Sequence, residues 1–350
     1  MRYILDILVI LLSLSITFVS DEYRIVGLPL YDILTVISSV VIAIYYPWKG
    51  FTVSKRFGVK LGILLTVVAG AGSLGTLVGL QLIGYDIQIN VLMRTLSSML
   101  LFTNVYLLIY GNDYRSKLIP ASFFAIALYQ GVLAIHQMSS GHRYVGTFDD
   151  PNYFGVFQAA VLCILLGLVS GKRPSIRLLF FYAIVVLLGI SVLLTFSRGA
   201  YLAAFGGLVM VLCSRMRKAR IKVLLGLVVI TIFVLISLPF VQDIPSFQRF
   251  RDRLNIAEAI KTGGTGRTVI WSLAFSQFIR NPFGYGWGTE RFVLKGRVSH
   301  NILFEVALQY GIIGVFLVVL ILSVFFKEAV SIAFSSEDGI NAGLAGAAIC

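Results

Sequence analysis

Three short motifs place residues with useful chemistry at the ends of long apolar runs. "SRG" contains Arg198, "GRT" contains Arg267 and "SHN" contains His300. A guanidinium offers a planar fork of N–H donors that matches a phosphate group. A neutral imidazole near pH 7 takes a proton as a general base. These residue types predict a site that binds an anionic substrate and transfers a proton.

Arg198 is the one charged residue between Leu178 and Ser214. That run makes about 56 Å of helix, whereas two membrane crossings need about 60 Å. We therefore expect the turn carrying Arg198 to lie slightly below the outer membrane surface, where a guanidinium is costly. Two interpretations stay open. Arg198 is either an interfacial residue that reaches lipid phosphate, or it is held in a protein-lined recess for an anionic substrate, with Ser197 as a neighbouring contact.

Arg267 follows the glycine-rich stretch "KTGGTG", and Thr265 is placed to cap a helix over 267–280. A helix N-terminus with a guanidinium beside it is suited to phosphate. An ordinary solvated arginine fits the same pattern, so this pattern alone leaves both interpretations open.

His300 comes directly after Ser299, a plausible N-cap, at the start of the last complete apolar span. Arginines near an imidazole disfavour its protonated form, which would leave His300 able to act as a base. The alternative is a capping or interfacial histidine. In the first case Asn301 is a candidate substrate contact.

A fourth stretch, "HRYVGTFDDPNYFG", precedes the sixth apolar span. Arg143 and Asn152 are candidate substrate contacts. Asp149 and Asp150 have the chemistry of a divalent-metal pair, but before Pro-Asn they equally form an Asx turn that caps the next helix. We predict no metal site. The three cysteines form no CxxC pair, so neither a zinc site nor a disulfide framework is indicated.

The composition requires a membrane to position these motifs. The chain is 58% hydrophobic and 13% charged, about half the charge of a soluble domain, and its apolar runs are long enough to cross a bilayer. We predict an all-α polytopic membrane protein with about 10–12 transmembrane helices. The predicted spans are approximately 3–20, 28–47, 59–80, 91–110, 118–138, 152–169, 178–196, 200–213, 222–240 and 300–326. An eleventh begins near Ile340 and is too short at Cys350 to cross, so we expect a fragment or an unfinished final helix.

Basic residues are concentrated in alternate loops, and the net charge is +13. The positive-inside rule then places Met1 in the cytoplasm and the poorly charged loops outside. The same counting puts the long loop 241–299, with its amphipathic segment 245–260, on the outer face. The excess charge suits anionic lipid headgroups, and we predict no nucleic-acid partner.

The stretches "GTFDDPNYFG", "TFSRGAYLA", "GRTVIWSLAFSQFIRNPFGYGWG" and "SHNILFEVALQYGIIG", in this order, resemble the O-antigen ligase/polymerase family of bacterial glycan enzymes. The resemblance covers roughly residues 140–320. We therefore divide the chain into N-terminal transmembrane helices, 1–138, and a ligase/polymerase-like membrane domain, 139–350.

This resemblance implies a metal-independent, inverting glycosyltransferase of the C type, without a cofactor, in the bacterial cytoplasmic membrane. The donor would be a glycan on undecaprenyl diphosphate, displayed on the outer face, and the acceptor another glycan or a lipid-linked sugar. Arg198 and Arg267 would face the diphosphate, and His300 would deprotonate the acceptor hydroxyl. We favour a polymerase slightly over a ligase. The alternative is a transporter or flippase of lipid-linked saccharides, but polar residues gathered on one face favour chemistry over transport.

Overall fold

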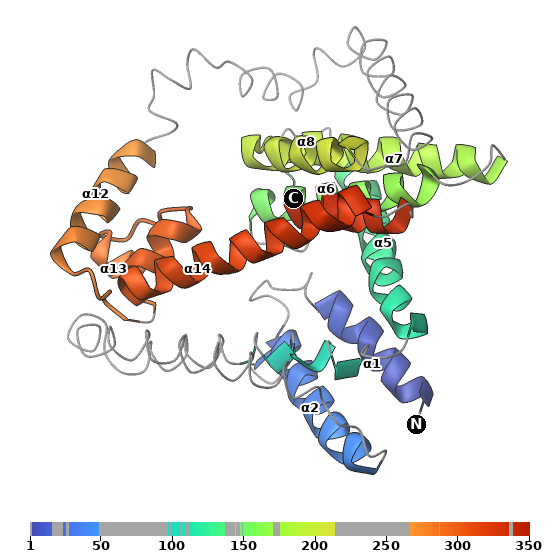
Figure 1. The fold of residues 1–350 in the computed structure, drawn as a ribbon, viewed down its shortest axis with the longest axis horizontal. Coiled ribbons are helices and arrows are strands. Elements are labelled where there is room, and N and C mark those ends of the chain that lie inside the picture. The colour runs from blue at the N-terminus through green and yellow to red at the C-terminus, as the bar shows by residue number, and fades with distance from the viewer. Residues whose placement is uncertain are drawn as a thin grey trace, which may run out of the picture. The chain divides into compact units, whose positions relative to one another are not determined.

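The computed structural model describes residues 2–15, 24–25, 28–48, separate residues between 97 and 108, 113–136, 144, 148, 150–170, 176–213, 267–286, 288–335 and 339–350. The predicted spans 59–80 and 222–240 and the predicted amphipathic segment 245–260 lie outside these residues, as does Arg143. Figure 1 shows the described elements as coloured ribbons.

The described part of the chain is helical apart from one pair of two-residue strands. The antiparallel strands are β1 (Arg24–Ile25) and β2 (Leu28–Pro29). The helices are α1 (Arg2–Ser15), α2 (Leu30–Trp48), α5 (Asp113–His136), α6 (Pro151–Ser170), α7 (Ile176–Leu194), α8 (Arg198–Cys213), α12 (Arg267–Arg280), α13 (Glu290–Val293), α14 (Ile302–Ser335) and α15 (Gly339–Ile349).

Three described helices are long and apolar enough to cross a membrane. They cover Lys117–His136, Pro151–Val169 and Ile302–Ser335, close to the predicted spans 118–138, 152–169 and 300–326. This confirms an all-α membrane protein in outline. The total of 10–12 spans and the orientation of the termini stay predictions.

Contacts between Cα atoms divide the chain into two units. Unit 1 comprises Met1–Leu34, Val105–Asn255 and Phe325–Cys350, and unit 2 comprises Thr35–Asn104 and Ile256–Val324. The division into domains at residue 138 stays a prediction.

The core of unit 1 is built around α6, which packs against α7, α8 and α15 and lies beside α7 and α8 in Figure 1. Buried apolar side chains such as Leu165, Leu188 and Val211 fill the space between these helices. The helices approach closely because glycines line the contact. A Cβ atom at Gly207 would lie 2.6 Å from Cys163 Sγ and 2.8 Å from the carbonyl oxygen of Gly346.

The close contact at Gly207 predicts a sharp difference between two adjacent glycines. Gly207→Ala should destabilise unit 1 by about 1–3 kcal/mol, because the added methyl group overpacks the contact. Gly206→Ala is the matched control, since its Cβ would lie 3.4 Å from Ile349 Cγ2, and alanine favours the helix by up to about 1 kcal/mol. Thermal unfolding in detergent measures both. Equal melting temperatures for the two variants would contradict this packing.

Candidate active site

The SRG motif forms a sharp turn between α7 and α8. The hydroxyl of Thr195 donates to the carbonyl oxygen of Val192 (2.7 Å) and accepts from the amide of Ser197 (3.2 Å). Phe196 has a φ of +50°, a left-handed conformation that is unfavourable for a residue with a side chain. Its buried ring packs in a cluster with Tyr144 and Phe154, and this packing holds the turn in place.

Ser197 is the N-cap of α8. Its Oγ accepts a hydrogen bond from the amide of Ala200 (3.1 Å), two residues beyond Arg198, which satisfies a free donor of the first helical turn. The same hydroxyl donates to Asn152 Oδ1 (2.5 Å). Ser197 is buried, whereas Arg198 is exposed. The cap therefore fixes the backbone from which the Arg198 side chain extends.

The first turn of α6 lies directly against the first turn of α8. Asp150 Oδ1 accepts from the amide of Asn152 (2.6 Å), so Asp150 caps α6 and the Asx interpretation holds for it. A Cβ at Gly155 would lie 2.4 Å from Ala200 Cβ, which shows how closely the two helices approach. No group of three potential metal ligands occurs among the described residues. The N-termini of α6 and α8 lie side by side, with the Asp150 carboxylate at the first and Arg198 at the second. The two helix dipoles and Arg198 favour an anion, and Asp150 offsets part of that potential.

In unit 2, α12 covers Arg267–Arg280, so the predicted helix 267–280 is confirmed. Trp271 lies one turn after Arg267, on the same side of the helix. Its indole Nε1 donates to the carbonyl oxygen of Ser299 (2.9 Å), and its ring lies 6.2 Å from that of Phe304. Because His300 is the next residue after Ser299, Arg267 and His300 lie at the same end of unit 2.

The SHN motif has a different capping arrangement from the predicted one. Asn301 Oδ1 accepts from the amide of Leu303 (2.9 Å), and the Asn301 carbonyl accepts from the amide of Glu305 (2.9 Å). Asn301 is therefore the N-cap of α14, and the assignment of Ser299 as the cap is wrong. His300, between the two, is exposed and has a φ of +49°. This left-handed residue turns the chain into the helix.

The "NPFGYGWG" stretch inserts its backbone into a break in α14. The helix is interrupted at Gly311, where φ is +67°. The amide of Tyr285 donates to the Leu308 carbonyl (2.6 Å), and the amide of Gly286 donates to that of Gln309 (3.0 Å). The Pro282 carbonyl in turn accepts from the amide of Ile312 (2.8 Å). The loop thus replaces helical hydrogen bonds that the break removes.

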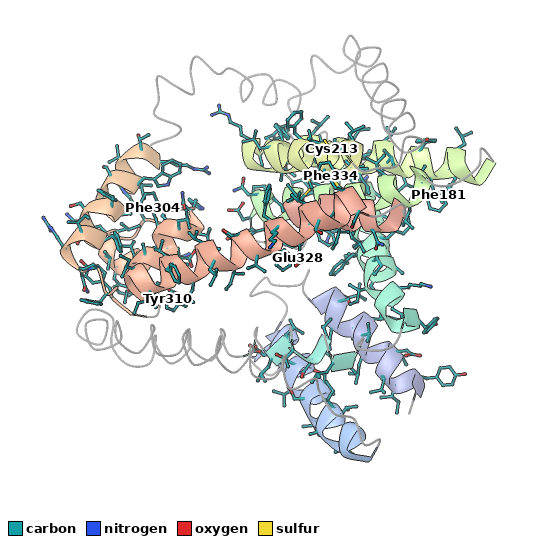
Figure 2. All side chains as sticks on the ribbon, viewed as in Figure 1. Phe181, Cys213, Phe304, Tyr310, Glu328 and Phe334 are labelled. Carbon is teal, nitrogen blue, oxygen red and sulfur yellow. The ribbon has the colours of Figure 1, made fainter. Side chains whose placement is uncertain are left out.

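Side chains extend this contact into a small core. Ala274 of α12, Leu294 after α13 and Leu308 of α14 are fully buried together. Figure 2 shows Phe304 and Tyr310 on the part of α14 beside α12 and α13. The Tyr285 hydroxyl donates to the Gln277 carbonyl (3.0 Å). Burial raises the pKa of Tyr285, and the Arg280 charge partly offsets that rise. The phenol therefore stays a neutral donor near pH 7.

A comparison with known protein families matches the part of the chain that contains these motifs. Residues 183–319 match the family model described as O-antigen ligase. This match supports the O-antigen ligase/polymerase family that the motifs resemble. The chain has no significant match among curated proteins or among solved structures.

The matched region 183–319 contains all three predicted catalytic residues, and they fall in different units. Arg198 lies in unit 1 with Ser197 and Asn152, whereas Arg267, His300 and Asn301 lie in unit 2. The substrate contacts of all these residues stay predictions. Sequence reasoning missed Trp271 and Glu290, which form hydrogen bonds with the main-chain carbonyl and amide of Ser299. Trp271, four residues after Arg267, was visible at helical spacing, but Glu290 had no pattern that marked it.

The break in α14 gives a second pair of glycines to compare. Gly284 has a φ of +88°, and its Cβ would lie 2.6 Å from the Gln309 carbonyl oxygen. Gly296 has a similar φ of +82°, but nothing lies within 4 Å of its Cβ position. Gly284→Ala should lower the melting temperature strongly, since strain and collision add. Gly296→Ala should cost only the strain, about 1 kcal/mol. If both variants melt alike, the loop does not pack into the break as described.

Proposed function

We propose that this protein is a membrane glycosyltransferase of the O-antigen polymerase or ligase type. It would move a glycan from undecaprenyl diphosphate to a hydroxyl acceptor on the outer face of the bacterial cytoplasmic membrane. The observation that carries this proposal is the hydrogen bond from Trp271 to the Ser299 carbonyl. It holds a cation for the diphosphate, Arg267, and a candidate base, His300, at the same end of one unit. The family match supports a ligase- or polymerase-type activity in general.

In the proposed reaction, a ring nitrogen of His300 takes the proton of the acceptor hydroxyl. The hydroxyl oxygen then bonds to the anomeric carbon of the donor while the bond from that carbon to the diphosphate oxygen breaks. A single displacement of this kind inverts the anomeric configuration. The proton on His300 is released to water or to the departing diphosphate.

The arginines act on the leaving group. Negative charge grows on the diphosphate as its bond to the sugar breaks, so fixed guanidinium groups bind the transition state more tightly than the substrate. Arg267 and Arg198 are the two residues proposed to supply this charge. At Arg198, the N-termini of α6 and α8 add their dipoles. We propose that these groups make a metal ion or a cofactor unnecessary.

The polar residues around these groups have supporting roles in the proposal. Ser197 and Asn152 hold the turn that carries Arg198, and both lie where an anionic headgroup would approach. Asn301 fixes the start of α14 beside His300. Arg143 is proposed as a further donor contact from the sequence alone. The acceptor is proposed to be another lipid-linked glycan, which would make the enzyme a polymerase.

The test is transfer by the purified full chain in lipid nanodiscs. The donor is the undecaprenyl-diphosphate glycan extracted from host cells that lack this protein, and product length is read on gels. His300→Ala, Arg267→Ala and Arg198→Ala should each lower the rate by about 10²–10³. Arg280→Ala is the matched control. It removes an exposed arginine from the opposite end of α12, and the rate should stay near that of the wild type.

Two outcomes would contradict the proposal. Full activity of both His300→Ala and Arg267→Ala would show that these side chains are not the base and the diphosphate ligand. Movement of the lipid-linked glycan across a vesicle membrane without any new glycosidic bond would instead identify a flippase.

A further inference from the structure

The main chain of Ser299 is held on both sides of its Cα atom, and these two main-chain groups are called the Ser299 peptide. Its amide donates to Glu290 Oε1 (2.8 Å), and its carbonyl accepts from Trp271 Nε1 (2.9 Å). Ser299 itself has no exposed surface. The two partners come from different helices, α13 and α12, so the peptide is fixed relative to both.

Glu290 is an unusual residue for this role, because it is an acidic side chain that is only 7% exposed. Burying a carboxylate costs free energy unless hydrogen bonds compensate for it. The Glu290 carboxylate accepts a hydrogen bond from the Ser299 amide. An exposed glutamate would avoid this cost. We therefore look for a function of the bond between Glu290 and Ser299.

The residue after this fixed peptide is His300, in its left-handed conformation. On its other side, Asn301 is fixed as the N-cap of α14 through the amide of Leu303. A left-handed histidine persists only where its surroundings determine the backbone. With both neighbours held, the direction in which the imidazole leaves the main chain is set as well.

A catalytic histidine is usually aligned by a hydrogen bond from its second ring nitrogen to a carboxylate or a carbonyl. Within the described ranges, no such bond to the His300 ring is recorded. The main chain is therefore the route by which the protein can align this base.

We propose that Glu290 and Trp271 are positioning residues for His300, acting through the Ser299 peptide. This inference rests on the proposed function of His300 as the base. Trp271 has a second effect, because it lies one helical turn from Arg267. Its bond to the Ser299 carbonyl therefore sets the spacing between Arg267 and His300. Neither residue needs to touch the substrate.

Two variants of Glu290 separate the effect of its hydrogen bond from the effect of its charge, and one variant of Trp271 tests the second hydrogen bond. Glu290→Gln keeps an oxygen that accepts from the Ser299 amide but removes the charge, whereas Glu290→Ala removes both. Trp271→Phe keeps an aromatic ring beside Phe304 but loses the N–H donor. Ser272→Ala is the control, because Ser272 is exposed and its hydroxyl donates to the carbonyl of Val269 in its own helix.

The first measurement is hydrogen exchange of the peptide spanning residues 295–301, read by mass spectrometry on the full chain in nanodiscs. Exchange of the Ser299 amide should be faster in Glu290→Ala than in the wild type, and close to wild type in Glu290→Gln and Ser272→Ala. Unchanged exchange in Glu290→Ala would overturn the inference. This measurement needs no substrate.

The second measurement is transfer kinetics with the same extracted lipid-linked glycan. Glu290→Ala and Trp271→Phe should lower kcat by about 10²-fold, as expected for a misplaced catalytic group. KM for the donor should change little, because the diphosphate ligands remain. Glu290→Gln should keep most of the kcat. If Glu290→Gln loses as much as Glu290→Ala, the charge and not the backbone bond is responsible, and the inference is wrong.

The two experiments also distinguish failure of the inference from failure of the proposed function. If His300→Ala transfers glycan at the full rate, the proposed mechanism is wrong whatever the exchange data show. If His300→Ala is inactive while Glu290→Ala keeps its kcat, the function stands and the positioning role is lost.

Discussion

Helix ends in an apolar chain need protein partners for their free N–H and C=O groups, because hydrocarbon offers none. Much of the candidate site consists of residues that bind these free groups at helix ends. Ser197 caps α8, Asp150 caps α6 and Asn301 caps α14. At the break in α14, the loop beginning at Pro282 supplies the missing hydrogen bonds. Each of these places fixes a backbone that would otherwise fray.

The same constraint explains why the functional candidates stand next to capping residues. Arg198 follows the cap of its helix, and His300 precedes the cap of its own. A side chain at such a position is exposed at the end of a helix, while its backbone is fixed by the cap. The two motifs thus combine a short polar residue that caps the helix with a larger residue whose side chain is exposed. The positive potential of helix N-termini adds to this arrangement and favours anionic ligands.

Local patterns predicted the elements well. Apolar length indicated the helices around α5, α6 and α14, and the glycine-rich stretch before Arg267 marked the start of α12. The hairpin carrying Arg198 followed from one charge in a long apolar run. These predictions succeeded because hydrophobic length and helix-start signals act over a few turns of chain.

Contacts between distant segments were harder to predict. Serine and asparagine are about equally good N-caps, so only the hydrogen bonds from the amides of Leu303 and Glu305 show that Asn301, not Ser299, caps α14. Gly284 is needed because it lies too close to the Gln309 carbonyl to carry a side chain. This contact joins a loop and a helix that are separate in the sequence. Glu290 resembles a solvated residue in "GTERF", because its burial arises only when α13 packs against the segment that leads to α14.

The geometry around Ser299 also bears on how a base is aligned where carboxylates are expensive. A carboxylate bonded directly to the His300 ring would orient the imidazole. It would also repel the diphosphate that the arginines are proposed to bind. Placing the carboxylate of Glu290 on a main-chain amide avoids that conflict. The carboxylate of Glu290 then accepts a hydrogen bond from a main-chain amide, and the direction of the backbone aligns the imidazole. In this arrangement the base can be held firmly while the groups that face the substrate stay positive.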